Sequence, residues 1–270
     1  MKLSIVSSLK ETKHNQEKII KKFSELCIML NSLGYDGIEL SILEPERIDI
    51  KKINEIKDSY SLEISAIGTG NTYIRYGYSL GHQNEQIRNN AIKRIQEYID
   101  FAYKTGSKVI IGLIRGRFNN ESSSNKEKSY IKASLRKCCQ LAENKGVTLL
   151  FEPINQFEID SYNTISEAIE LINQISSNNL KLLIDTFHMY LEEDPGFIWE
   201  DLKEITHLVS HLHLADTNRR TPGTGHFDFK TFLEIFKRSG YNGFASIETI
   251  MKPSFEEVAK NSSEYLRLII

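Results

Sequence analysis

Residues 182–188 read LLIDTFH, and residues 211–216 read HLHLAD. Each stretch is a short run of mainly apolar residues that leads into polar ones, with Asp185 in the first and His213 in the second. Short runs of this kind alternate with longer helical patterns along the whole chain. Such alternation predicts an α/β fold, in which a parallel sheet is covered by helices.

The alternation gives about eight strands, the number in a closed (β/α)8 barrel. The predicted strands are Leu3–Ser7, Gly37–Ile42, Glu63–Gly68, Lys108–Leu113, Thr148–Glu152, Lys181–Asp185, Leu208–Ala215 and Phe244–Glu248. Apolar residues recur at helical spacing in Gln16–Leu33 and Asn84–Lys104, which we expect outside the barrel. The 270 residues suit one such barrel, and no linker rich in proline, glycine or serine divides them. The sequence therefore predicts a single-domain TIM barrel over residues 1–270.

The composition favours a small-molecule partner. With 34 basic and 36 acidic residues, the formal net charge of −2 gives no field that would gather nucleic acid or an anionic membrane. No apolar run approaches the roughly 18 residues of a membrane span, and the sequence turns polar after residue 8, so we expect a cytoplasmic protein. Cys27, Cys138 and Cys139 form no C-x-x-C pair and are expected to be buried apolar residues.

Four residues that can bind a metal ion stand at the ends of four successive predicted strands. They are Glu152, Asp185, His213 and Glu248, each about one strand-plus-helix unit after the last. Parallel strands of a TIM barrel deliver their carboxyl ends to one mouth, so we expect these side chains to meet. Three carboxylates and one imidazole suit one divalent ion, Mn²⁺, Mg²⁺ or Co²⁺, whereas a structural zinc site would favour thiolates. A helix cap or an ion pair is the alternative for each residue alone, and His211 is expected to support His213 or to pack in the core.

Two loops and two arginines follow strand ends on the same side of the predicted barrel. Residues 69–85, which contain tyrosines, and residues 115–126, which are rich in serine, are candidate lids, with ordinary surface loops as the alternative. Arg115 follows the fourth strand and Arg219 the seventh, where a guanidinium group can bind a carboxylate or phosphate through two hydrogen bonds. For Arg115, a surface ion pair is the alternative to contact with a substrate.

The motifs resemble those of a known family. The stretches EPINQFE at 152–158, DTFH at 185–188, HLHLADTNRRTPGTGHFDF at 211–229 and the final SIET are similar to the D-tagatose 3-epimerase branch of the xylose isomerase-like TIM barrels, which are sugar phosphate isomerases and epimerases. The resemblance covers nearly the whole chain. It implies that the metal ligands are Glu152, Asp185, His213 and Glu248. It also implies substrate contacts from Glu158, His188 and Arg219, to which a substrate with a carboxylate would add Arg115.

This resemblance implies a metal-dependent epimerase of a small ketose or keto sugar acid. Inverting a carbon next to a ketone requires a base on each face of the substrate. Glu152 and Glu248 come from the fifth and eighth predicted strands and can flank the substrate while each keeps one oxygen on the metal. The cation would stabilise the enediolate that forms when the proton leaves.

Two other activities are compatible with these motifs. An aldose–ketose isomerase of the hydroxypyruvate type would use the same residues to move a proton between neighbouring carbons. A multi-zinc phosphodiesterase similar to endonuclease IV would need histidines after the third and fourth strands, where the sequence has AIGTGN and IGLIRGR, although His188, His226 and Asp228 partly match its other ligands. Relatives usually form dimers or tetramers, so we expect a homo-oligomer that binds neither nucleic acid nor a membrane.

Overall fold

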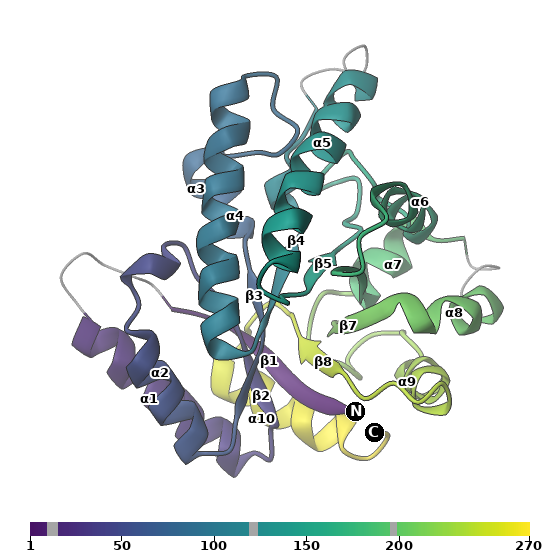
Figure 1. Cartoon of the computed structure of the whole chain (residues 1–270). Coiled ribbons are helices and arrows are strands. Elements are labelled where there is room, and N and C mark those ends of the chain that lie inside the picture. The colour runs from purple at the N-terminus through teal and green to yellow at the C-terminus, as the bar shows by residue number, and fades with distance from the viewer. Residues whose placement is uncertain (10–15, 119–123, 195–198) are drawn as a thin grey trace.

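The chain forms a closed barrel of eight strands surrounded by helices (Figure 1). The structure, a computed structural model, describes residues 1–9, 16–118, 124–194 and 199–270. The strands follow one another around the barrel in chain order, all neighbours are parallel, and the last strand closes the barrel against the first. This topology confirms the α/β fold and the TIM barrel predicted from the sequence.

Each strand lies at or near its predicted position. The strands are β1 (Lys2–Ser8), β2 (Gly37–Ser41), β3 (Glu63–Gly68), β4 (Lys108–Ile111), β5 (Leu149–Phe151), β6 (Leu180–Asp185), β7 (Val209–Leu214) and β8 (Phe244–Ile247). Because β5 and β8 end one residue earlier than predicted, Glu152 and Glu248 come directly after them. Their backbones still join the sheet, since Glu152 N–H donates to Ile111 O and Glu248 N–H donates to Leu214 O.

The helices form the outer layer of the barrel (Figure 1). They are α1 (Gln16–Ser32), α2 (Ile50–Ser59), α3 (Gly70–Tyr76), α4 (Glu85–Thr105), α5 (Ser124–Glu143), α6 (Ile165–Ile175), α7 (Thr186–Glu192), α8 (Glu200–Ile205), α9 (Phe229–Arg238) and α10 (Phe255–Leu266), with short 3-10 turns η1 (Pro45–Arg47), η2 (Leu113–Arg115) and η4 (Thr206–Leu208). The helices predicted at Gln16–Leu33 and Asn84–Lys104 are α1 and α4. Asn84 caps α4 by accepting a hydrogen bond from Gln86 N–H.

Inside the barrel, one group of buried side chains is apolar and another is polar. Strands β3 to β6 contribute a small buried cluster, separate from the main core, of Ala66, Ile110, Leu150 and Leu183. Strands β2 and β7 contribute the buried polar side chains of Glu39, His211 and His213. Buried polar groups need partners, so a site with specific contacts is expected near these polar side chains.

Two further predictions concern the cysteines and membranes. Cys27, Cys138 and Cys139 are free and buried, as predicted. Burial raises the pKa of the Cys139 thiol to about 11, which keeps it protonated and unreactive at neutral pH.

Among the helices of the described residues, none has the length and apolar character needed to cross a membrane.

Candidate metal centre and substrate pocket

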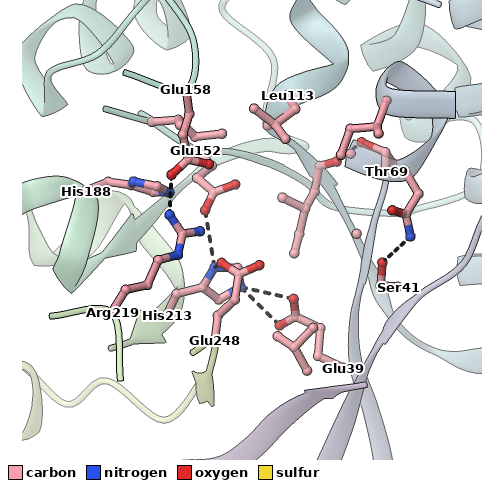
Figure 2. A pocket seen from close by; sticks show the side chains of 18 residues that line it. Glu39, Ser41, Thr69, Leu113, Glu152, Glu158, His188, His213, Arg219 and Glu248 are labelled. Atoms are coloured by element: carbon pink, nitrogen blue, oxygen red, sulfur yellow. Dashed lines mark hydrogen bonds and ion pairs between the residues drawn. The ribbon is translucent and has the colours of Figure 1, made fainter. Parts of the chain in front are cut away.

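The four predicted metal ligands meet at the carboxyl ends of β5 to β8. One ligand atom from each of Glu152, Asp185, His213 and Glu248 lies within 4.8 Å of the others. Nδ1 of His213 is 3.1 Å from Glu248 Oε2, 3.2 Å from Glu152 Oε1 and 3.7 Å from Asp185 Oδ2. Figure 2 shows Glu152, His213 and Glu248 converging on one side of the pocket. Neighbouring parallel strands thus bring together side chains that are far apart in the sequence.

The spacing of these atoms fits one divalent ion. An octahedral ion about 2.1 Å from its ligands places neighbouring ligand atoms about 3 Å apart and opposite ones about 4.2 Å apart. The three separations from His213 Nδ1 fall within this range. Oxygen and imidazole nitrogen are also the donors that such ions accept.

Asp185 provides a second indication of a cation. Its Oδ1 caps α7 by accepting hydrogen bonds from Phe187 N–H at 2.7 Å and His188 N–H at 3.2 Å. Its Oδ2 is buried, faces His213 and has no hydrogen-bond partner among the described residues. Leaving a carboxylate oxygen unpaired and away from water is costly. A metal ion bound to Oδ2 would remove that cost.

The charges around His213 favour positive charge at this point. Burial alone would lower the pKa of His213, but the carboxylates of Glu39 and Glu248 outweigh burial and raise it well above its ordinary value. Burial likewise opposes ionisation of Asp185, but His188 and His213 outweigh it and lower the pKa of Asp185. A cluster of carboxylates that stabilises a proton on an imidazole will also attract a cation.

The site also contains Glu39 of β2, a residue that was not predicted from the sequence. Its carboxylate oxygens lie 3.0 and 3.1 Å from His213 Nε2, the ring nitrogen that faces away from the other carboxylates, and one of them is 2.8 Å from His211 Nε2. His211, expected to support His213 or to pack, contacts Glu39. A signal was present, because Glu39 is a lone charge within GIELSI at 37–42, a stretch predicted to be a strand.

Three of the predicted substrate contacts lie together in the pocket (Figure 2). Glu158, His188 and Arg219 all line the cavity into which the metal ligands open. Glu158 forms an ion pair with Arg219. The Arg219 guanidinium also lies 4.9 Å from the centre of the Phe187 ring, which restricts its orientation. The arrangement offers both hydrogen-bond donors and acceptors to a polar molecule bound in the cavity.

Asn155, in the EPIN stretch, fixes the tautomer of His188. Asn155 Oδ1 accepts a hydrogen bond from Phe157 N–H at 3.1 Å, so its Nδ2 group faces Glu158 Oε1 at 3.0 Å and His188 Nδ1 at 2.7 Å. An amide nitrogen only donates, so His188 Nδ1 must accept. A neutral His188 ring therefore carries its proton on Nε2, which is the donor left for a bound molecule.

The structure corrects the prediction that Arg115 contacts the substrate. Its side chain is 0% exposed and is not among the residues that line the pocket. The guanidinium donates to the carbonyl oxygens of Gly112, Glu152, Ser161 and Tyr162 at distances of 2.7 to 3.3 Å. A surface ion pair is equally excluded by this burial. Arg115 instead holds the backbone at Glu152 and the loop that follows it.

Apart from Glu39, the opposite wall of the cavity carries neutral side chains. The cavity has a volume of about 180 Å³, and on this side it is lined by Val6, Ser41, Thr69, Asn71 and Leu113. Asn71 Nδ2 donates to Ser41 Oγ at 2.8 Å. Asn71 belongs to α3, so the tyrosine-containing segment predicted as a lid forms part of the pocket wall. The serine-rich segment includes residues 119–123, which lie outside the described residues.

Of the residues that match the additional ligands of a multi-zinc site, His188 lines this pocket, but the others do not reach it in the described part of the chain. After β3 and β4, the cavity is lined by Thr69, Gly70, Asn71, Ile74, Gly112 and Leu113, none of which offers an imidazole. His226 and Asp228 are exposed and do not line the cavity, and Asp228 caps α9. The geometry thus favours one metal ion over a multi-zinc centre.

The fold is a TIM barrel, and at its mouth lies a cluster of side chains that can hold a metal ion. In a comparison with known protein families, the xylose isomerase-like TIM barrel family matches residues 29–269. The chain therefore belongs to the xylose isomerase-like TIM barrel family, as its motifs predicted.

Its relatives include sugar epimerases. The 3-dehydro-D-guloside 4-epimerase of Escherichia coli (strain K12) is 26% identical over 242 residues, which cover 86% of this chain and 87% of that protein. The D-psicose 3-epimerase of Ruminiclostridium cellulolyticum is 29% identical over 230 residues, which cover 82% of this chain and 75% of that protein. Among solved structures, the D-allulose 3-epimerase from Methylomonas sp. matches 100% of this chain and 98% of its own, with a TM-score of 0.85 at 18% identity.

Proposed function

We propose that this protein is an epimerase of a small neutral ketose that uses one divalent metal ion, with Glu152 and Glu248 as its two bases. The observation that carries the proposal is the placement of these glutamates. They follow β5 and β8, with β6 and β7 between them, yet a carboxylate oxygen of each lies within 3.2 Å of His213 Nδ1. Relatives named as sugar epimerases support the same reaction class.

In the proposed reaction, one glutamate removes the proton from the carbon next to the ketone. The other glutamate returns a proton to the opposite face, which inverts the carbon. When bound, a divalent cation supplies positive charge beside the substrate oxygens, where the charge of the enediolate develops. Because the reaction is reversible, Glu152 and Glu248 exchange roles between the two directions.

Glu158, His188 and Arg219 would orient the substrate between the two bases. His188 offers Nε2–H to a substrate oxygen, and the Glu158–Arg219 pair offers an acceptor and donors to neighbouring hydroxyl groups. Asn155 holds His188 and Glu158 through its amide group. This fixed arrangement matters because proton transfer requires the reacting atoms to lie within hydrogen-bond distance.

The charges in the pocket favour a neutral sugar over a keto sugar acid. Among the described residues that line the cavity, Arg219 is the one lysine or arginine, and it is paired with Glu158. Arg115, which we expected to bind an acidic substrate, is buried against backbone carbonyl groups. Four glutamates line the same cavity, and their negative charge would oppose a substrate carboxylate.

A panel of neutral ketoses and ketoaldonates, each supplied with Mn²⁺, tests this proposal. We expect interconversion of neutral ketoses that differ at the carbon next to the carbonyl, with slower turnover of the ketoaldonates. Products can be identified by NMR. A clear preference for the ketoaldonates would contradict the neutral substrate. Formation of aldoses would show that the protein is an aldose–ketose isomerase instead. Hydrolysis of phosphodiesters, with several zinc ions bound per chain, would show that it is an endonuclease-like phosphodiesterase.

A further inference from the structure

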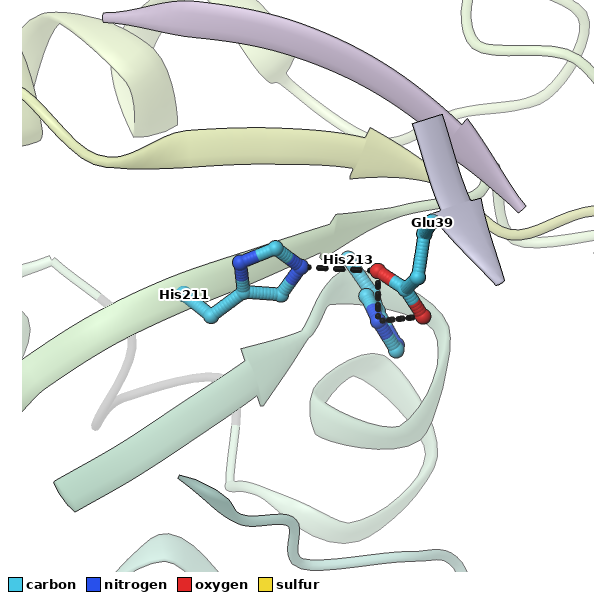
Figure 3. A group of neighbouring side chains, drawn as sticks. All are labelled: Glu39, His211 and His213. Carbon is cyan, nitrogen blue, oxygen red and sulfur yellow. Dashed lines mark hydrogen bonds and ion pairs between the residues drawn. The ribbon is translucent and has the colours of Figure 1, made fainter. Parts of the chain in front are cut away.

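Glu39 contacts two histidine rings inside the barrel (Figure 3). Its two carboxylate oxygens are 3.0 and 3.1 Å from His213 Nε2, and Oε2 is also 2.8 Å from His211 Nε2. Glu39 comes from β2 and the histidines from β7, strands that are not neighbours in the barrel. None of the three residues is more than 2% exposed. A buried carboxylate is tolerated only when it is paired and hydrogen-bonded, and here both partners are histidines.

We propose that Glu39 is a positioning residue that holds His213 in the tautomer that a metal ion requires. A carboxylate only accepts hydrogen bonds, so Nε2 donates to Glu39, whereas Nδ1, 3.2 Å from Glu152 Oε1, can donate only when no metal ion is bound to it. With Nε2–H donated to Glu39, the lone pair of a neutral His213 ring lies on Nδ1. Nδ1 is the nitrogen that faces Glu152, Asp185 and Glu248. A carboxylate on the other ring nitrogen also makes an imidazole a stronger ligand.

His211 completes the arrangement. Its Nε2 faces Glu39 Oε2, whereas its Nδ1 is buried with no hydrogen-bond partner among the described residues. A neutral His211 ring with its proton on Nε2 accounts for both observations, because Nε2–H then donates to Glu39 and Nδ1 carries no proton that needs an acceptor. With hydrogen bonds from two rings, the carboxylate of Glu39 is held facing His213.

A second metal ion bound by Glu39, His211 and His213 is the competing interpretation, since the three side chains lie close enough to form a ligand set. In that case His213 would bind an ion through each nitrogen, which requires the ring to lose both protons. The separations of 2.8 to 3.1 Å match N–H···O hydrogen bonds, and they leave neither oxygen of Glu39 without a partner, in contrast to Asp185 Oδ2. The hydrogen-bonded arrangement needs no additional ion, and counting bound ions distinguishes the two.

Two substitutions of Glu39 test the proposal, with a matched control on the next strand. Glu39→Gln keeps the size of the side chain, but its amide has one acceptor oxygen for two histidines and carries no charge. Glu39→Leu removes both acceptor oxygens. The control is Glu63→Gln on β3, where the Glu63 side chain is 55% exposed and paired with Lys2. All four proteins, including wild type, are prepared free of metal and titrated with Mn²⁺.

We expect the Mn²⁺ dissociation constant, measured by calorimetry or electron paramagnetic resonance, to rise about 10-fold in Glu39→Gln and about 100-fold in Glu39→Leu. The control should bind as wild type does, with one ion per chain. Thermal unfolding of the metal-free proteins identifies a merely structural role. Unchanged Mn²⁺ affinity in folded Glu39 variants would overturn the proposal, whatever their melting temperature, and so would two ions per wild-type chain.

This inference rests on the metal site of the proposed function and not on its substrate. Failure of the wild-type chain to bind Mn²⁺ would overturn both proposals, whereas binding without epimerase activity would overturn the proposed function alone. If the variants do not fold, nitrogen-15 NMR of the His213 ring in the wild-type protein, loaded with Mg²⁺, is decisive. We expect the ring proton on Nε2, and a proton on Nδ1 would overturn the proposal.

Discussion

The two halves of the barrel mouth differ in charge and in how tightly their side chains are held. The half formed by β5 to β8 carries Glu152, Asp185, His213 and Glu248, and ion pairs or hydrogen bonds hold most of its polar groups in place. The half formed by β1 to β4 lines the cavity mainly with small neutral side chains. Glu39 is the charged exception, and it is directed at His213. This difference suggests that the chemistry is located in one half and the selection of the substrate in the other.

The largest expected effect comes from removing a base in the charged half. With saturating Mn²⁺, Glu248→Gln should lower kcat by about 10²- to 10⁴-fold, the usual contribution of a positioned acid or base. Kinetic assays at several Mn²⁺ concentrations ensure that the effect is not one of metal occupancy. Glu256→Gln, at an exposed position in the first turn of α10, is the matched control and should leave kcat unchanged. Near-normal turnover of Glu248→Gln would show that the charged half does not supply both bases.

The substitution Asp185→Asn tests whether Oδ2, the unpaired oxygen of Asp185, is a metal ligand. Asn at this position keeps one carbonyl oxygen that can cap α7, so the melting temperature of the metal-free protein should change little. Loss of a ligand should raise the Mn²⁺ dissociation constant at least about 100-fold, since even groups that only hydrogen-bond to a ligand contribute about 10- to 100-fold. A chelator should accordingly lower the melting temperature of the wild type but not of Asp185→Asn. Equal Mn²⁺ affinity in the two proteins would remove Asp185 from the site.

The substitution Arg115→Met tests whether the Arg115 side chain stabilises the contact between the two halves. Its position in η2 follows β4, and its guanidinium holds carbonyl groups of the chain after β5. Arg115→Met keeps much of the volume but removes all of these donors, so we expect the free energy of unfolding to fall by about 2–4 kcal/mol. Urea unfolding measures this loss. Arg238→Met, on the exposed face of α9, should change the stability by no more than about 0.5 kcal/mol, and an equally small effect at Arg115 would contradict its structural role.

The smallest expected effect comes from the neutral half. Asn71→Ala removes a side chain that lines the cavity and donates to Ser41 Oγ. A hydrogen bond contributes about 0.5–1.5 kcal/mol, so the ratio of kcat/KM between two ketoses that differ far from the carbonyl should change no more than about tenfold. The Mn²⁺ dissociation constant should not change. A loss of kcat comparable with that of Glu248→Gln would invalidate the division of the mouth into two halves.

The features that could be predicted from the sequence are those that are visible within a single strand, such as the polar residue at its end. An apolar run that ends in a polar residue is visible locally, so the positions of Asp185 and His213 at the ends of β6 and β7 follow from the pattern alone. Glu152 and Glu248 were found for the same reason. Their convergence needed only the assumption of a closed parallel barrel.

The features that were missed depend on contacts between distant strands. Glu39 contacts His213 because closure of the barrel brings β2 and β7 to face the same interior, and no local pattern identifies that pair. Arg115 follows β4, as predicted, but the short turn η2 directs its side chain into the protein instead of the cavity. The direction of a side chain after a strand end is set by the loop, which period-two alternation does not describe.

In the proposed mechanism, Glu152 and Glu248 act on opposite faces of a carbon next to a ketone. The most direct test is to run the reaction in D₂O with Mn²⁺ and a neutral ketose that the enzyme converts, and to analyse the first product by NMR. We predict one deuterium on the inverted carbon, because the returned proton comes from a second glutamate that exchanges with solvent. An epimeric product that carries no deuterium at that carbon would contradict this two-base mechanism.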